Sequence, residues 1–314
     1  MKKTLHFKSS DGKNTIHAVC WEPEGIQPVA VLQIVHGMVE YIERYEEFAE
    51  YLNSKGFVVV GHDHLGHGDY VKSQEEWGFI AEENPSGKMV IDIRRMFAGT
   101  KKKYPDIPYF LLGHSMGSYL VRKYITVYGN DLSGIILTGT GMESKATTKA
   151  GLLVIRALTK KFGPGYRSDF VSELMYTSPY KLYDLKGIDP ERGWITRDAE
   201  ITKKYYSDPK CTFTFTLNGY EALVSTVDFV CDKKNIAKIP KKVPLLIASG
   251  DMDPVGNLGK GVKEFYNAVV KTGKINVDCK LFPDARHEIL NEINRDEVYD
   301  YIYDWMMDKA SVNV

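Results

Sequence analysis

The feature that most constrains the fold of this chain is an alternation of short apolar runs with stretches of helical spacing. The runs are residues 29–35, 57–60, 109–112, 134–138, 243–249 and 277–282. Such runs predict strands that are buried on both faces of a largely parallel sheet. Helical spacing appears at 42–54, 87–103, 116–128, 259–271 and 289–307. The sequence therefore predicts an α/β fold built from β-α-β units.

Two segments modify this pattern. Residues 4–7 and 15–21 predict an antiparallel pair of strands around a turn at residues 10–14. From residue 141 to 238 the alternation stops, and the sequence is helical, irregular and rich in Tyr, Phe and Leu. An insertion between two strands of one sheet explains this change. We predict a core formed by residues 1–140 and 239–314, and an insertion formed by residues 141–238.

Composition excludes several classes of protein. An apolar fraction of 43% with 26% charged residues is ordinary for a globular protein and excludes wholesale disorder. Lysine and arginine together number 41, as do aspartate and glutamate. The one short basic run, Lys101 to Lys103, is interpreted as the solvated end of a helix. We therefore expect no nucleic-acid partner, and a chain that folds as a monomer or a simple homo-oligomer.

No targeting or membrane signal is evident. The charged start Met1-Lys2-Lys3 is not followed by an apolar h-region. No apolar run reaches the roughly 20 residues that a membrane-spanning helix needs. Four scattered cysteines form no C-x-x-C pair, so neither a zinc knuckle nor a disulfide scaffold is indicated. We expect a soluble, cytoplasmic protein with reduced thiols.

The strongest chemical signal is the segment Gly113-His114-Ser115-Met116-Gly117, which lies between a predicted strand and a predicted helix. A serine hydroxyl needs a base and a fixed geometry to act as a nucleophile. A sharp turn from strand to helix presents the hydroxyl, and it requires small residues such as Gly113 and Gly117 on either side. Ser115 is therefore the candidate nucleophile. The alternative, a turn of small residues without chemistry, is the weaker interpretation.

The remaining members of a triad follow in the order Ser, acid, His that is typical of this turn. Among the eight histidines, only His287 follows a plausible acid downstream of Ser115, so it is the candidate base. The strand at 243–249 is followed by two carboxylates, Asp251 and Asp253. The spacing favours Asp253 as the acid and leaves Asp251 to cap the loop. Glu288, beside His287, is expected to be solvated.

Acyl transfer also needs two backbone N–H groups for the developing oxyanion. The N–H of Met116, directly after the nucleophile, is the first candidate. The second is the N–H of Met38, in the segment Val35-His36-Gly37-Met38 at the end of an apolar run. Gly37 permits a close approach of the backbone. His36 is expected to hold this loop by hydrogen bonds, and no cofactor or metal is needed.

Taken together, five segments resemble the monoacylglycerol lipase and lysophospholipase branch of the α/β-hydrolases, which is also grouped with serine aminopeptidase-like proteins. They are His36 to Tyr41 with Arg44-Tyr45, Asp63 to Gly68, Gly113 to Gly117, Gly250 to Val255, and Arg286-His287-Glu288. The resemblance implies an eight-stranded, mostly parallel sheet with helices on both faces and a helical cap, which is the insertion at residues 141–238. Three positions depart from the pattern: Tyr41, Asp69 and Ser118. The first two are expected to alter the rim of the site.

The same resemblance implies a serine esterase whose substrates are monoacylglycerols, lysophospholipids or other acyl esters. It also leaves transient contact between the cap and a membrane surface open. Aromatic cap residues are candidates for an acyl pocket, although most of them are expected to form cap core. These residues are Phe162, Tyr205, Tyr206, Phe213 and Phe215.

Three alternatives stay open. His62-Asp63-His64 with His67 has the composition of a zinc site. An aminopeptidase would need cap carboxylates for the substrate amino group, and Asp169, Glu173 and Glu221 are candidates. A non-catalytic binding protein with the same fold is the third, although the intact set of candidate nucleophile, base, acid and oxyanion glycine argues against it.

Overall fold

The computed structural model describes residues 1–71 and 73–311. An eight-stranded sheet forms its centre, in the order β1-β2-β4-β3-β5-β6-β7-β8. The strands are β1 (Lys2–Lys8), β2 (Thr15–Trp21), β3 (Ala30–Val35), β4 (Phe57–His62), β5 (Tyr109–His114), β6 (Gly134–Thr138), β7 (Leu245–Gly250) and β8 (Val277–Phe282). β2 is antiparallel to β1 and β4, and all other neighbours are parallel. The predicted, mostly parallel sheet is therefore confirmed.

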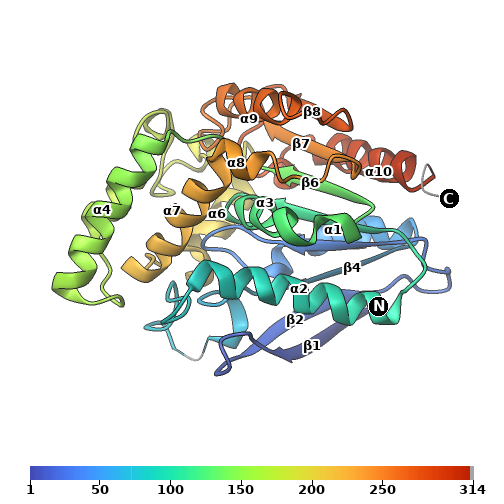
Figure 1. Ribbon diagram of the computed structural model, residues 1–314, viewed down its shortest axis with the longest axis horizontal. Coiled ribbons are helices and arrows are strands. Elements are labelled where there is room, and N and C mark those ends of the chain that lie inside the picture. Colours follow the sequence, from blue (N-terminus) through green and yellow to red (C-terminus); the bar gives the residue numbers. More distant parts are fainter. Residues whose placement is uncertain (72, 312–314) are drawn as a thin grey trace.

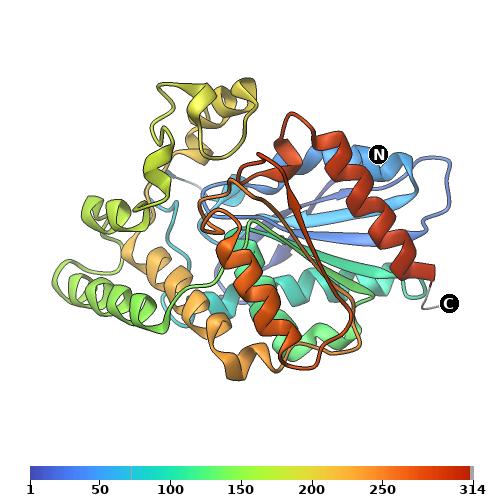
Figure 2. The same ribbon diagram turned by 90° about the horizontal axis from the view of Figure 1, so that it is seen from above.

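Helices cover both faces of the sheet (Figures 1 and 2). On one face, α2 (Pro85–Lys103), α3 (Met116–Tyr128) and α9 (Lys260–Val270) contribute to one hydrophobic cluster. On the other, α1 (Glu46–Ser54) and α10 (Arg295–Ser311) contribute to a second. Every residue of β3 to β7 is buried, as the continuous apolar runs predict for strands covered on both sides. This arrangement confirms the α/β-hydrolase fold.

Strand register brings three loops together at one edge of the sheet. β5 lies between β3 and β6, with Val35 beside Gly113 and His114 beside Thr138. Because these strands are parallel, their carboxyl ends meet at the same edge. The segments that begin at His36, Ser115 and Gly139 therefore leave the sheet side by side.

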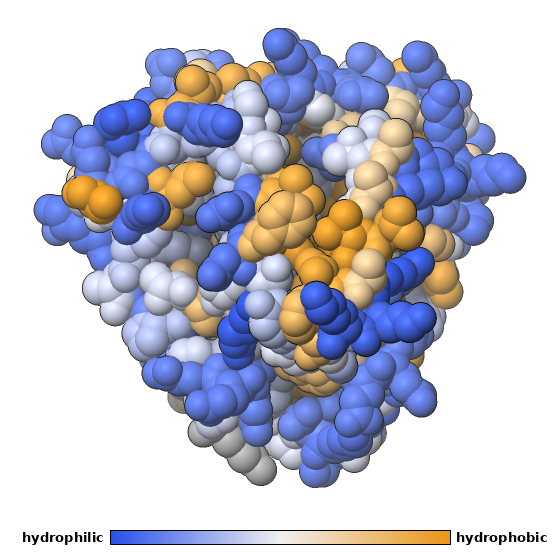
Figure 3. Space-filling view, turned by 90° about the vertical axis from the view of Figure 1, so that its left-hand side faces the viewer, coloured by the Kyte–Doolittle hydropathy of each residue, from blue (hydrophilic) through white to orange (hydrophobic). Residues whose placement is uncertain are grey.

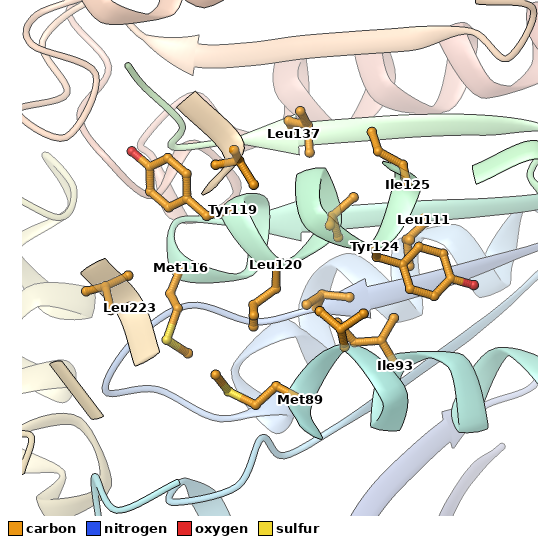
Figure 4. Close-up of a cluster of buried hydrophobic side chains, with 14 of the residues drawn as sticks. Met89, Ile93, Leu111, Met116, Tyr119, Leu120, Tyr124, Ile125, Leu137 and Leu223 are labelled. Carbon is orange, nitrogen blue, oxygen red and sulfur yellow. The ribbon is translucent and has the colours of Figure 1, made fainter. Parts of the chain in front are cut away.

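The chain between β6 and β7 forms the insertion at the left of Figure 1. Its helices are α4 (Lys145–Phe162), α5 (Asp169–Met175), α6 (Ala199–Ser207), α7 (Leu217–Cys231) and α8 (Lys233–Ile236). Leu223 of α7 belongs to the same buried cluster as Met89 of α2 and Met116 of α3 (Figure 4). The last long helix of the insertion is thus part of the main core. The division into two core segments and a separate cap stays a prediction.

Two predicted helices differ from the structure. The helix expected at 42–54 begins as a 3-10 turn, η1 (Ile42–Tyr45), before α1. The helix expected at 289–307 is divided into a short turn, η7 (Ile289–Asn291), and α10. Glu292 interrupts it because its carboxylate accepts the Arg286 N–H at 2.7 Å and pairs with Arg197 at 2.9 Å. Its backbone is extended, with φ −77° and ψ 163°, so the helical pattern alone did not predict this break.

Candidate active site

Ser115 occupies a strained turn between β5 and α3. Its φ of 52° and ψ of −121° lie where side-chain-bearing residues are rare. A Cβ at Gly113 would lie 2.5 Å from the Gly117 carbonyl oxygen, and a Cβ at Gly117 would lie 2.0 Å from that of Val35. Both flanking positions therefore require glycine. The predicted strand–turn–helix around Ser115 is present.

His287 and Asp253 meet at the carboxyl edge of the sheet. The loop after β8 carries His287, and the loop after β7 carries Asp253. His287 Nδ1 lies 3.0 Å from Asp253 Oδ1, and Asp253 also accepts the Ser249 hydroxyl and the Val255 N–H. Burial by itself lowers the pKa of His287, but the adjacent Asp253 carboxylate outweighs it and raises that pKa above its ordinary value. The pair has the geometry of a base and its orienting acid.

His114, the residue before Ser115, lies against His287. The two imidazole rings lie 4.6 Å apart, and His114 Nδ1 lies 3.0 Å from the Thr138 hydroxyl. Burial, with the nearby charge of His287, holds the pKa of His114 well below its usual range, so His114 is a neutral neighbour. A Cβ at Gly139 would lie 2.7 Å from His287 Cε1 and 2.9 Å from His114 Cε1. Sequence reasoning missed Gly139, although its position directly after β6 is a signal for such a close approach.

The loop after β3 approaches Ser115 through Gly37. A Cβ at Gly37 would lie 3.0 Å from the Ser115 Cβ, so the N–H of Met38 is one peptide away from this contact. His36 fixes the loop: its Nδ1 lies 2.8 Å from the Gly37 carbonyl oxygen, and its Nε2 accepts the His64 N–H at 2.9 Å. Met116 is the first residue of α3, where backbone N–H groups have no acceptor within the helix. Both candidate oxyanion donors thus lie in segments that adjoin Ser115.

A buried ionic group, here called the Arg44 cluster, lies behind this loop and consists of Glu40, Arg44 and Glu288. Arg44 donates to both Glu288 carboxylate oxygens at 2.8 Å and to Glu40 at 3.0 Å. Burial opposes the charge of Glu288, but Arg44 outweighs it and lowers the Glu288 pKa, whereas burial raises the pKa of Glu40 to about 7. Glu40 also accepts the Gly37 N–H.

The expectation that Glu288 is solvated was therefore wrong. Its side chain is buried because Arg44, from a segment 244 residues away in the sequence, supplies the compensating charge. The cluster connects the residue after His287 with the loop that carries Gly37 and Met38. A glutamate beside a histidine gives no sequence signal for such a distant partner.

Tyr41 and Asp69, two of the residues that depart from the family pattern, both contact one turn of the insertion. This turn consists of η6 (Pro209–Cys211) and the residue before it. The Tyr41 hydroxyl donates to Asp208 at 2.8 Å, and Lys210 pairs with Asp69 at 2.8 Å. These contacts join the insertion to the rim of the core. The third departure, Ser118, is buried and donates to the Ser115 carbonyl oxygen at 2.6 Å.

The histidines at 62, 64 and 67 pack as rings. His62 lies 5.4 Å from Phe7, and His67 lies 5.3 Å from Phe215. Asp63 accepts from His17 at 2.8 Å and from the Ile42 N–H at 2.9 Å. Across residues 1–71 and 73–311, no group of three or more His, Cys, Asp or Glu side chains is placed to hold a metal ion.

The aromatic candidates for an acyl pocket have different positions. The Tyr205 hydroxyl donates to the Val39 carbonyl oxygen at 3.3 Å, and its ring lies under the Arg44 guanidinium. Phe213 and Phe215 pack against each other and against His67. Phe162 is 46% exposed and stacks on Tyr166 at the outer surface. Tyr205 thus contacts the loop that carries Gly37 and Met38.

Comparison with known proteins agrees with this geometry. Residues 26–294 match the family described as "Serine aminopeptidase, S33". A monoglyceride lipase of Rattus norvegicus is 30% identical over 300 residues, which covers 92% of this chain and 88% of the relative. A monoacylglycerol lipase of Mycolicibacterium smegmatis is 23% identical and covers 96% and 95% of the two chains.

A solved structure shows the same likeness in three dimensions. A thermostable carboxyl esterase from Bacillus coagulans, in complex with glycerol, superposes with a TM-score of 0.88 at 31% identity. The match covers 98% of this chain and 99% of the esterase. The chain therefore belongs to the serine aminopeptidase S33 family of α/β-hydrolases and is, like these relatives, a hydrolase of the lipase and esterase type.

Proposed function

We propose that the protein cleaves carboxylic esters through an acyl-enzyme on Ser115. The observation that carries this proposal is the buried His287–Asp253 pair, in which the His287 ring lies 4.6 Å from that of His114, the residue before a serine held at positive φ. A hydrogen bond from Nδ1 to Asp253 fixes the tautomer in which Nε2 is the free base. Gly37 lets the loop that carries the Met38 N–H approach Ser115 closely, because a Cβ there would lie 3.0 Å from the Ser115 Cβ.

The proposed reaction has two halves. His287 Nε2 takes the proton of Ser115 while Oγ attacks the ester carbonyl carbon, and the N–H groups of Met38 and Met116 bind the oxyanion. The C–O bond to the alcohol breaks, and the alcohol leaves with the proton from His287. Water then attacks the acyl-enzyme with His287 as base, which releases the carboxylic acid and restores Ser115.

Monoacylglycerols, lysophospholipids and short-to-medium acyl esters are the proposed substrate class. The names of the rat and mycobacterial relatives support a monoacylglycerol, and a 24% identical phospholipase of Bacillus subtilis supports a phospholipid headgroup. A series of acyl chain lengths, tested as p-nitrophenyl esters, monoacylglycerols and lysophospholipids, ranks these classes. The chemistry requires Ser115→Ala and His287→Ala to remove nearly all turnover, and substantial activity in either variant would contradict it.

Peptide hydrolysis is the weaker candidate. Asp169 and Glu173 are exposed, and Glu221 pairs with Arg156 at 2.8 Å, so these cap carboxylates face solvent or an arginine. We expect turnover of p-nitrophenyl esters to exceed that of aminoacyl anilides. The opposite order would support an aminopeptidase. A non-catalytic role requires no turnover of either, together with tight binding of a ligand.

We also propose that the insertion contacts lipid surfaces transiently. Figure 3 shows apolar surface gathered on the face that carries the insertion, with hydrophilic residues around it. Large apolar side chains exposed in the insertion include Leu153, Phe162, Tyr166, Phe170, Leu174 and Leu182. In the part of the chain that the structure describes, no helix combines the length and apolarity needed to cross a bilayer. A cytoplasmic location and a monomeric or simple oligomeric state stay predictions.

Vesicle binding tests this contact. Replacing Phe170 and Leu174 by serine should reduce co-sedimentation with phosphatidylcholine vesicles, because apolar side chains drive interfacial binding. Val127, which is 68% exposed on α3, is the matched control, and Val127→Ser should leave co-sedimentation unchanged. Equal co-sedimentation of the wild type, the Phe170 and Leu174 double variant and Val127→Ser would contradict the proposal.

A further inference from the structure

The ring of His287 has a second aromatic neighbour, which comes from the insertion. Trp194 stacks on it, with ring centroids 4.9 Å apart and an angle of 29° between the planes. His114 lies against the same imidazole at 4.6 Å. The imidazole is therefore flanked by the residue before Ser115 and by an indole that the sequence did not single out.

The segment around Trp194 is bound to the histidine loop along its length. Arg286 donates to the carbonyl oxygens of Glu191 and Thr196, and also to that of Gly193. On the other side of the base, the Glu288 N–H donates to the Ile195 carbonyl oxygen at 2.7 Å. The two residues that flank His287 in the chain thus hold the residues on both sides of Trp194.

Further contacts close this junction. The Thr196 hydroxyl donates to the Asn291 carbonyl oxygen at 2.7 Å, and Arg197 pairs with the buried Glu292 at 2.9 Å. Behind the indole, the rings of Tyr176 and Tyr180 pack edge-on at 6.3 Å and 5.5 Å. The position of the indole is therefore fixed from the loop side and from behind, and its face is presented to His287.

We propose that Trp194 is a positioning residue for the base: its indole holds the His287 ring toward Ser115 and stabilises the imidazolium that forms when Ser115 loses its proton. The proposal rests on the function proposed above. Tryptophan presents the most favourable ring face to a cation, and the interaction is strongest where water is excluded. His287 is only 2% exposed, so this condition is met.

Trp194→Leu tests the proposal, because leucine keeps the site apolar but removes the π face. We expect kcat for an ester to fall roughly 5- to 30-fold, with a smaller change in KM. The acidic limb of kcat/KM, which reports protonation of the base, should move to lower pH by about one pH unit. The substitution leaves in place the carboxylates that raise the His287 pKa, namely Asp253, Glu288 and Glu40, and the ring contact with His114.

Trp194→Phe keeps an aromatic face and should restore kcat to within about 3-fold of the wild type, with an intermediate acidic limb. The control is Trp77→Leu, the same change at an indole that stacks on Phe213 at 5.5 Å. It should leave both kcat and the acidic limb unchanged. If Trp194→Leu does not fold, Trp194→Phe becomes the test. An acidic limb that moves to lower pH then supports the proposal, and an unchanged limb contradicts it.

The rate at which a fluorophosphonate labels Ser115 separates the two proposals. If the wild-type protein is not labelled, or Ser115→Ala is labelled equally well, the proposed function fails. If the wild type is labelled and Trp194→Leu is labelled at the same rate with the same pH dependence, the proposal for Trp194 fails alone. Slower labelling of Trp194→Leu, with an acidic limb at lower pH, supports it.

Discussion

Replacing Asp253 by asparagine tests the central pair of the site with little change of shape. In the structure, Asp253 Oδ1 accepts from His287 at 3.0 Å and from the Val255 N–H at 2.9 Å, while Oδ2 accepts the Ser249 hydroxyl at 3.2 Å. An asparagine whose oxygen takes the place of Oδ1 keeps the first two bonds. The change therefore removes mainly the negative charge beside the base.

The expected loss follows from the burial of this pair, in which Asp253 has no exposed surface. Removing one charge of a buried, hydrogen-bonded pair costs about 2–5 kcal/mol. Because the imidazolium forms in the transition state, about 3 kcal/mol appears as a loss of roughly 150-fold in kcat. If the amide N–H₂ turns toward His287 and stabilises the other tautomer, the loss rises to about 10⁴-fold.

The pH profile gives an independent result. In the wild type the pKa of His287 is raised above 6.5, and the base acts only when neutral, so kcat/KM should rise with pH through a value above 6.5. In Asp253→Asn, the carboxylate that raises the pKa of His287 most is gone while burial still lowers it, so the acidic limb should move to lower pH. Steady-state hydrolysis of a p-nitrophenyl ester from pH 5 to 9 measures both effects.

The matched control is Asp251→Asn. Asp251 accepts the Asp284 N–H at 2.7 Å, and an amide oxygen preserves that bond. We expect kcat within about 2-fold of the wild type. Equal losses for the two variants, or a larger loss for Asp251→Asn, would refute the assignment of Asp253 as the acid.

Three further predictions concern the surroundings of the site. Gly37→Ala should lower kcat at least about 10-fold, because the new Cβ would lie 3.0 Å from the Ser115 Cβ. The control is Gly99→Ala, at a helical position with open space around it, which should stabilise the fold by about 0.5–1 kcal/mol and leave kcat unchanged. Tyr41→Phe should cost about 1 kcal/mol in urea unfolding and Lys210→Ala less, because the lysine pair is more exposed. Arg44→Met should cost about 3–5 kcal/mol. The loss of unfolding free energy relative to the wild type should be larger at pH 8 than at pH 5, because the two carboxylates left without Arg44 must ionise while buried. An equal loss at both pH values in urea unfolding would contradict this prediction.

The sequence predicts the sheet well because the signal is local. The buried strands are continuous apolar runs, and the observed bounds of α3, β6 and β8 match the predicted ones. The turn at Ser115 is equally local, since both glycines lie within two residues of it. The order of Asp253 and His287 along the chain needed only the fold class.

The parts that could not be predicted depend on partners that are distant in the sequence. Glu288 is buried only because Arg44 lies 244 residues before it, and Gly139 has a role only because two histidine rings meet above it. Trp194 lies in an irregular segment whose conformation is set by hydrogen bonds to the histidine loop. Hydrophobic periodicity carries no information about such contacts.

These distant contacts also restrict how the insertion can move. Residues 191–197 are bound to the loop of His287 by backbone and side-chain hydrogen bonds and by the ion pair of Arg197 with Glu292. A displacement of this segment would break those bonds or move His287, the proposed base. By contrast, the contacts of η6 with the core include the partly exposed Lys210–Asp69 pair, which is worth about 0–1 kcal/mol. A rearrangement that admits a substrate and keeps both these bonds and His287 in place must therefore move other parts of the insertion.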